Sequence, residues 1–505
     1  SYFRHLSQRA LGVYFLLGGA GVFIVAIAQL SRGRKQLPLL LPKLESTGPT
    51  ARMAKLSRWS VAASGIFLGA LLFSLSLGLT TPLPNNSAQI DKLLGTEADT
   101  GTAAAVPDAA SPEELKLNWP SFRGVSGGFS LLTNVPATWD AKTGAGIAWK
   151  TAAPTSGFNS PVVWGNRVFF SGGDAEKREV FCLDGKSGQL LWRQAVANVP
   201  GSPAQAPEIP ESTGYAASTM ATDGRRVYVM FANGDVAALT LEGKPVWSKG
   251  FGALKNTYGY ANSLCTWQDR LIIQLDQGDS EEGKSKLYAL DGRTGKVVWQ
   301  QPRKVGASWA SPMVIEAAGK PQIIVLSVPW AIAYSATDGK ELWRVECLNG
   351  EVTPSPAFAG GFVLVASPSE KLLAIRPDGQ GDVTKTHVAW FNEDNVPDVT
   401  SPASNGELVF TVTTSGLLSC FDLKDGKKQW EHDLDMECHA SPVMAGNRVY
   451  LFSQKGRVVV VEAARQYKEL FRTEMEDGFH ATPAFGPNGM VLRGLKDIWC
   501  VGEKK

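Results

Sequence analysis

The sequence lacks a net charge of any size, because 50 Lys and Arg residues stand against 48 Asp and Glu residues and leave a formal charge of +2. This balance excludes the basic footprint of a nucleic-acid-binding protein. Its six cysteines form no Cys-x-x-Cys pair, which excludes a zinc ribbon and a c-type haem attachment site. Glycine and proline, by contrast, are plentiful at 52 and 29 residues, as in a turn-rich β protein.

Two stretches near the start, residues 10–30 and 59–79, each run for 21 residues without a charged side chain. A helix of that length spans the roughly 30 Å hydrocarbon core of a bilayer. A signal peptide is the alternative for the first stretch, but the run is too long and leads into SRGRK instead of a small-residue cleavage site. We therefore predict a transmembrane helical hairpin over residues 1–80, with Gly65 and Gly69 forming a close packing face between helices or lying against lipid.

The loop between the two stretches, residues 31–58, is strongly basic and has a single acid, Glu45. Its basic residues are Arg32, Arg34, Lys35, Lys43, Arg52, Lys55 and Arg58. Positively charged loops stay on the cytoplasmic side of a membrane. We expect a bacterial inner-membrane protein whose remaining chain lies on the periplasmic side. Residues 81–117, rich in Pro, Ala, Thr and acids, are predicted to be a flexible linker.

From residue 118 onward a tryptophan recurs every 40 to 55 residues, each at the end of a short strand. The repeat positions are Trp149, Trp192, Trp247, Trp299, Trp343, Trp390 and Trp430, with Phe471 in the eighth place. A second marker, Ser-Pro or a variant of it, opens an apolar strand in each unit. Two markers in step at this period indicate a β-propeller. We predict eight blades over residues 118–505, with seven as the alternative, and expect the first and last strands to complete one blade together.

The strings Asp184–Trp192 and Asp291–Trp299 share the pattern Asp-x-x-[Ser/Thr]-Gly-x-x-x-Trp, which resembles the repeat of PQQ-like β-propellers. The segment NWPSFRG at 118–124 resembles the start of domains in that family. The family includes quinoprotein dehydrogenases and a scaffold lipoprotein of outer-membrane protein assembly, so the resemblance implies the fold more strongly than a function.

The resemblance also implies what a catalytic member should carry: PQQ on the axis, a disulfide between adjacent cysteines, and calcium held by carboxylates and amides. This sequence has no adjacent cysteines and no motif onto which those residues map. We therefore assign no catalytic, cofactor-binding or metal-binding residue and expect no cofactor; PQQ with calcium belongs to the alternative function only. Cys347 and Cys438 lie near blade junctions, where oxidation outside the cytoplasm is open.

One set of side chains lies two residues before each strand-opening Ser, or at the position aligned with it, and is predicted to surround one mouth of the central channel. The set is Phe158, Tyr215, Tyr260, Trp309, Thr353, Val399, His439 and His480. Aromatic and imidazole groups there would bind a ligand, a peptide or a partner's loop. The alternative is channel packing with satisfied histidines; a metal would need about four ligands.

These features favour a non-catalytic, membrane-anchored propeller that acts as an interaction or scaffold subunit of a membrane complex, in envelope biogenesis or respiration. Other protein subunits are the expected partners, and nucleic acid is not. A periplasmic PQQ-dependent dehydrogenase that feeds electrons to the membrane is the alternative. A sensor of solutes or glycans that uses the aromatic ring is a third hypothesis.

Overall fold

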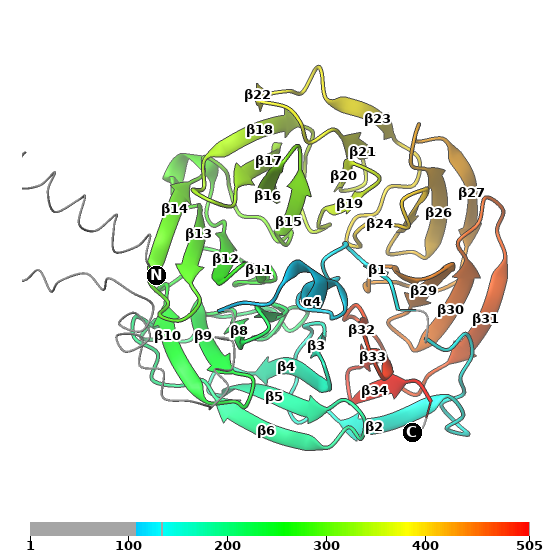
Figure 1. Cartoon of the computed structure of the whole chain (residues 1–505), viewed down its shortest axis with the longest axis horizontal. Coiled ribbons are helices and arrows are strands. Elements are labelled where there is room, and N and C mark those ends of the chain that lie inside the picture. Colours follow the sequence, from blue (N-terminus) through cyan, green and yellow to red (C-terminus); the bar gives the residue numbers. More distant parts are fainter. Residues whose placement is uncertain (1–107, 133–134, 504–505) are drawn as a thin grey trace, which may run out of the picture. The chain divides into compact units, whose positions relative to one another are not determined.

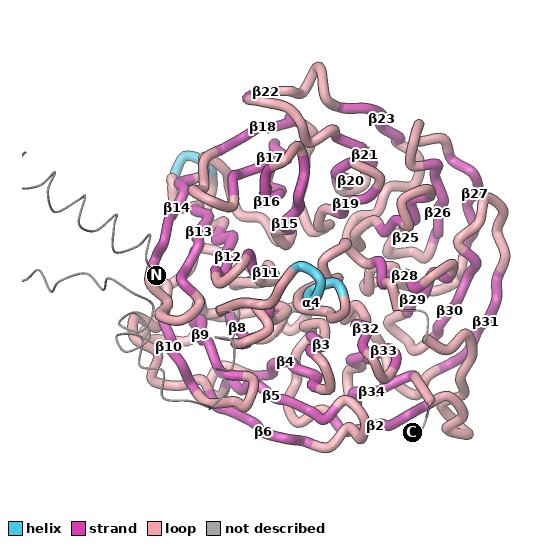
Figure 2. Tube along the Cα trace, in the orientation of Figure 1, coloured by secondary structure: helices cyan, strands magenta, loops and turns pink. Residues whose placement is uncertain are grey.

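A computed structural model describes residues 108–132 and 135–503, which lie in one compact unit of the chain. These residues form a ring of eight β-sheets around a central axis (Figure 1). Eight blades are thus confirmed. Strands and loops account for nearly everything drawn in Figure 2, with helix confined to short segments.

Blades 1 to 4 are consecutive four-stranded antiparallel sheets, numbered from the axis outward. They consist of β3 (Val162–Trp164), β4 (Arg167–Gly173), β5 (Arg178–Asp184) and β6 (Leu190–Ala195); β7 (Ala221–Thr222), β8 (Arg226–Met230), β9 (Asp235–Thr240) and β10 (Pro245–Gly250); β11 (Cys265–Trp267), β12 (Arg270–Leu275), β13 (Lys286–Asp291) and β14 (Val297–Pro302); and β15 (Met313–Ala317), β16 (Lys320–Ser327), β17 (Trp330–Ser335) and β18 (Glu341–Glu346). A short 3-10 helix, η2 (Ser280–Glu282), interrupts blade 3.

Blades 5 to 8 repeat this plan, and the last blade takes its outer strand from the start of the ring. They consist of β19 (Ala357–Ala359), β20 (Phe362–Ser367), β21 (Lys371–Ile375) and β23 (Val388–Asn392); β24 (Ala403–Ser404), β25 (Leu408–Val412), β26 (Leu417–Asp422) and β27 (Lys428–Asp433); β28 (Val443–Ala445), β29 (Arg448–Phe452), β30 (Arg457–Glu462) and β31 (Glu469–Glu474); and β32 (Ala484–Gly486), β33 (Gly489–Arg493), β34 (Asp497–Val501) and β2 (Ile147–Ala152). Because β2 pairs with β34, the two ends of the propeller chain share one sheet.

Two short strands extend blades in parallel. β1 (Phe129–Ser130) pairs with the inner strand of blade 7, and β22 (Gly381–Asp382) pairs with the outer strand of blade 4. The middle strands are buried along almost their whole length, whereas the outer strands alternate between exposed and half-buried side chains. The apolar core therefore lies between adjacent blades.

The repeated tryptophan joins one blade to the next. In six blades its indole N–H donates to a backbone carbonyl in the outer turn of the following blade, over 2.7 to 3.2 Å. These pairs are Trp149 to Gly185, Trp192 to Leu241, Trp247 to Gly292, Trp299 to Ala336, Trp390 to Leu423 and Trp430 to Ala464. Trp343 instead donates to the Gln322 amide oxygen in its own blade, and Gln322 donates to the Pro377 carbonyl in blade 5.

The turn before each tryptophan is built from its own side chains. The Asp184 carboxylate accepts the backbone N–H groups of Lys186 and Ser187 and the Ser187 hydroxyl, and these bonds help to lower its pKa although burial opposes them. Gly188 then takes φ +70° directly against the Trp149 ring, where a Cβ would lie 2.5 Å from Cε3. The Asp-x-x-Ser-Gly string is thus a turn and a blade contact.

The predicted linker differs from the structure in its last residues. Pro112–Lys116 form the short helix α4, with Ser111 and Glu114 completing a capping box and Pro112 at its first turn. Residues 10–30 and 59–79, with Gly65 and Gly69, lie outside the described residues. Within the part of the chain that the structure describes, no helix is long and apolar enough to cross a membrane.

Candidate functional site

Eight hydroxyl groups encircle the axis in a closed ring of hydrogen bonds. The backbone N–H of each member donates to the side-chain oxygen of the member on the next blade, over 2.8 to 3.3 Å. In order, the members of this hydroxyl ring are Ser160, Thr219, Ser263, Ser311, Ser355, Ser401, Ser441 and Thr482, and Thr482 donates back to Ser160. The Ser-Pro marker of the sequence therefore fixes how the blades meet at the axis.

The hydroxyl ring lines a cavity of about 160 Å³ at one end of the axis, here called the open mouth. Six side chains of the predicted set line it too: Phe158, Trp309, Thr353, Val399, His439 and His480. The rest of the lining is Phe122, Ala217, Ala261 and Ala481. No lining side chain is Asp, Glu, Lys or Arg, so the open mouth is polar without a fixed charge.

Tyr215 and Tyr260 do not line the open mouth. The Tyr215 hydroxyl donates to the Pro207 carbonyl, and Tyr260 is 2% exposed within the core of blades 2 and 3. Burial raises the pKa of both phenols. Ala217 and Ala261 take their places, because the register is set by the ring hydroxyls two residues later. Counting back from those hydroxyls, rather than choosing the nearest aromatic residue, identifies the correct positions.

The two histidines of the open mouth contact each other directly. Their Nδ1 atoms lie 3.2 Å apart and their rings meet edge to face, with Phe158 5.2 Å from the His480 ring. A neutral imidazole carries one N–H, so one ring donates and the other accepts. Burial lowers the pKa of both; Asp398 and Glu437 oppose this weakly at His439, while His439 lowers that of His480 further. The pair is therefore neutral at neutral pH.

The aromatic wall of the open mouth is held from behind. The Trp309 indole N–H donates to the Asn256 side-chain oxygen over 2.9 Å, and its ring meets Tyr258 edge to face at 5.0 Å. The Thr353 hydroxyl donates to the Asp398 carbonyl over 2.7 Å. These contacts fix the side chains before anything binds, which lowers the entropic cost of recognition.

The opposite end of the axis is covered by the chain's own entry segment. Figure 1 shows α4 and the residues after it crossing the centre of the ring, and β1 reaching blade 7. Asn118 accepts the Gly165 N–H over 2.6 Å in the turn that ends β3, whereas Ser160 precedes the start of that strand. The entry segment and the open mouth thus lie at opposite ends of the innermost strands.

At the axis the entry segment inserts Phe122 and Arg123. Arg123 is 1% exposed, and its guanidinium donates to the carbonyls of Gly127, Pro356 and Pro402. Burial lowers the pKa of Arg123 to about 9. Among the described residues it has no carboxylate partner, so a positive charge lies uncompensated under the floor of the open mouth.

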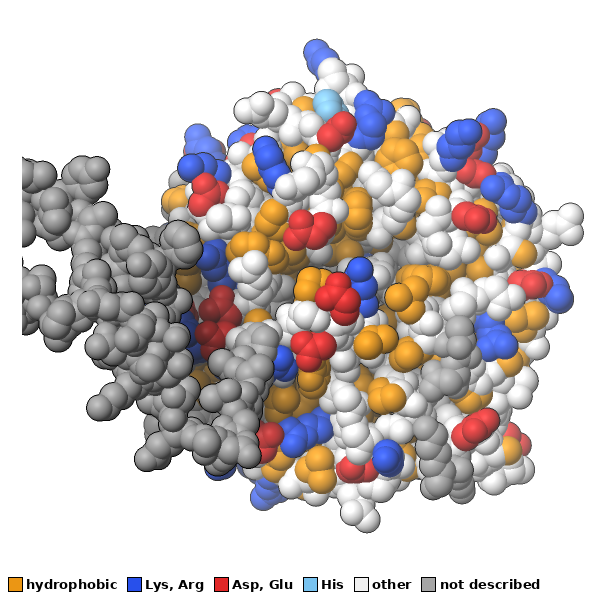
Figure 3. Space-filling view, in the orientation of Figure 1, with side chains coloured by type: hydrophobic (Ala, Val, Ile, Leu, Met, Phe, Trp, Pro, Cys, Tyr) orange, Lys and Arg blue, Asp and Glu red, His pale blue; other side chains and the backbone are white. Residues whose placement is uncertain are grey.

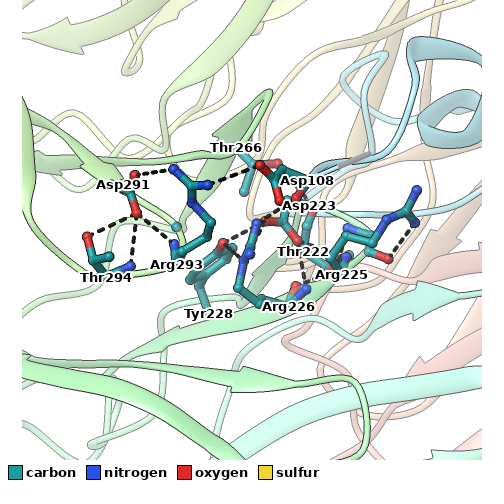
Figure 4. A network of polar contacts seen from close by, with 12 residues as sticks. Asp108, Thr222, Asp223, Arg225, Arg226, Tyr228, Thr266, Asp291, Arg293 and Thr294 are labelled. Atoms are coloured by element: carbon teal, nitrogen blue, oxygen red, sulfur yellow. Dashed lines mark hydrogen bonds and ion pairs between the residues drawn. The ribbon is translucent and has the colours of Figure 1, made fainter. Parts of the chain in front are cut away.

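Blades 2 and 3 hold the entry segment in place (Figure 4). Arg226 donates to the Asp108 carbonyl over 2.7 Å and to the Asp223 carboxylate over 2.6 Å, and Arg293 pairs with the Asp108 carboxylate at 3.1 Å. The Tyr228 hydroxyl also donates to Asp223 over 2.7 Å. Figure 3 shows this covered face, where apolar side chains gather around the centre between the charged groups of α4.

The residues of the open mouth do not fit PQQ with calcium. Calcium takes six to eight oxygen ligands, mostly carboxylates and carbonyls. The lining offers no carboxylate and no side-chain amide, and across the described ranges no three His, Cys, Asp or Glu side chains are placed to hold a metal. All six cysteines are buried and unpaired, Cys347 and Cys438 included, so no disulfide faces the axis.

Comparison with known proteins places the fold in a family. The family described as outer membrane protein assembly factor BamB matches residues 116–261 and 283–492. The outer membrane protein assembly factor BamB of Burkholderia pseudomallei (strain K96243) is 27% identical over 228 residues, which cover 41% of this chain and 53% of that relative. The chain therefore spans about half the length of the curated relative it matches.

Two solved structures share the architecture. The quinohemoprotein alcohol dehydrogenase from Comamonas testosteroni superposes with a TM-score of 0.59 over 79% of this chain and 82% of that one, at 14% identity. BamB from Moraxella catarrhalis superposes with a TM-score of 0.50 over 70% and 97%, also at 14% identity. At this identity the likeness shows the fold and not the activity.

Proposed function

Because the chain belongs to the family of the outer membrane protein assembly factor BamB, we propose that it is a non-catalytic, membrane-anchored interaction subunit of a membrane protein complex in the bacterial envelope. Residues 10–30 and 59–79 anchor it in the inner membrane, with residues 31–58 on the cytoplasmic side. The propeller then lies in the periplasm. The relative's name, an assembly factor, supports docking of other proteins as the task of the ring.

The observation that carries this proposal is the difference between the two ends of the axis. One end is covered by the entry segment, with Arg123 and the contacts of Asp108 holding it down. The other end is a preformed, uncharged cavity with aromatic walls. Preformed concave sites with aromatic anchors are where partners bind. We therefore place the docking surface at the open mouth.

A matched pair of bulky, neutral substitutions tests the docking surface. Val399, 36% exposed at the open mouth, and Leu117, 64% exposed on the covered face, are each replaced by Trp. The full chain is purified in mild detergent, and co-purifying membrane proteins are quantified by mass spectrometry. V399W should lose the partners that the wild type and L117W retain. Equal retention by V399W and L117W would place docking elsewhere.

A quinoprotein dehydrogenase is the alternative function, and reconstitution separates it from the scaffold. The purified full chain is titrated with PQQ and calcium while absorbance and dye reduction with alcohols and sugars are followed. The scaffold predicts neither tight binding nor turnover, because the lining supplies no calcium ligand set. Stoichiometric PQQ binding with dye reduction would overturn the scaffold proposal.

A further inference from the structure

The hydroxyl ring leaves eight hydrogen-bond donors free at the open mouth. Each Ser or Thr oxygen already accepts a backbone N–H from the neighbouring blade. Each hydroxyl also carries one hydrogen. Among the described residues none of these eight hydroxyls donates to a protein acceptor, although all eight are at most 7% exposed and line the same cavity. Buried donors without acceptors call for a partner.

The other groups of the open mouth do not supply the missing acceptors. The Thr353 hydroxyl is committed to the Asp398 carbonyl, and the two histidine Nδ1 atoms are committed to each other. No Asp, Glu, Asn or Gln side chain lines the cavity. The carboxylate of Asp398 is itself engaged by the Thr414 N–H and hydroxyl, over 3.1 and 2.6 Å. The cavity is therefore rich in donors and poor in acceptors.

A buried positive charge adds to this donor excess. A second cavity of about 60 Å³ shares Phe122, Ser311 and Ser355 with the open mouth and is also lined by Arg123. The Arg123 guanidinium has only carbonyl partners, and its buried Nε has none among the described residues. A cation removed from water without a counter-charge favours an anion nearby.

We propose that the open mouth binds a carboxylate group, which the free hydroxyls of the ring hydrogen-bond and the charge of Arg123 attracts. Phe158 and Trp309 in the wall cover the apolar part of the molecule that carries it. A small organic acid and an acidic side chain of a docking polypeptide present the same chemistry. Only the second source rests on the proposed docking function; the site itself does not.

The test uses the purified full chain in detergent and titrates it with succinate by calorimetry, in a carboxylate-free buffer at constant ionic strength. Ala261, a partly buried lining residue, is replaced by Asp and, as the matched neutral control, by Asn. Like charges within about 4–6 Å oppose each other strongly. A261D should therefore bind succinate at least tenfold more weakly than A261N, and neutral succinamide should not bind.

The site is refuted if succinate shows no saturable binding to the wild type, or binds A261D as tightly as A261N. Ala217→Asp and Ala217→Asn, on the neighbouring blade, repeat the comparison should either Ala261 variant fail to fold. Partner retention then identifies the source: a docking polypeptide that supplies the carboxylate is lost from A261D and kept by A261N, whereas a small acid leaves retention equal. The succinate titration stands whether or not any partner co-purifies.

Discussion

Replacing Gly339 by Ala should destabilise the propeller far more than replacing Gly319, although both lie in turns of blade 4. Their φ angles are +74° and +71°, so an alanine pays the same left-handed penalty at each, about 1–2 kcal/mol. At Gly339 the new Cβ would lie 2.5 Å from Cε3 of Trp299, whereas nothing lies within 4 Å at Gly319. Overpacking of this kind costs about 1–3 kcal/mol.

The expected losses in the free energy of unfolding are therefore about 2–5 kcal/mol for G339A and about 1–2 kcal/mol for G319A. Guanidinium unfolding of the full chain, followed by tryptophan fluorescence, measures both midpoints. Because the two variants share the backbone penalty, their difference isolates the contact between the turn of blade 4 and the tryptophan of blade 3. Equal midpoints would refute the view that this contact joins the blades.

Three further predictions concern the axis and the core. Ser401→Ala removes the acceptor of the Ser355 N–H and should cost about 1–3 kcal/mol, whereas Ser401→Thr keeps the hydroxyl and should be near neutral in the same unfolding assay. The lowered pKa values of His439 and His480 mean that the unfolded chain binds more protons, so the unfolding midpoint should fall as pH drops below about 6.5, and less steeply in H439Q/H480Q. Burial raises the pKa of all six thiols to about 12, so Ellman's reagent at pH 8 should label none in the native chain and all six after unfolding without reductant; four would reveal a disulfide.

Much of the fold was predictable because its markers are local. A tryptophan and a Ser-Pro in each unit are enough to count the blades, and the structure confirms eight. The register failed at Tyr215 and Tyr260, where the blades lack Ser-Pro and an aromatic residue lies close to the true position. The helix at Pro112–Lys116 has a local signal, the Ser-Pro-Glu-Glu capping box, which a reading by composition passes over.

The covered end of the axis was beyond reach of the sequence. Arg123 belongs to a recognisable opening motif, yet its partners Pro356 and Pro402 are 233 and 279 residues away. Nothing in the local pattern of a buried arginine tells which carbonyls receive it. The same holds for the hydroxyl ring: the Ser positions repeat visibly, but the closed circle of bonds exists only once eight blades meet.

Site-specific photo-cross-linking tests the central claim, that partners dock at the open mouth, most directly. A photoreactive amino acid replaces Val399 in one full-length chain and Leu117 in another, each expressed in its own membrane and irradiated there. Leu117 is the more exposed of the two, at 64% against 36%, so random collisions would favour the covered face. The account predicts discrete cross-links to membrane-complex proteins from position 399. Cross-links from position 117 alone, or from neither, would contradict it.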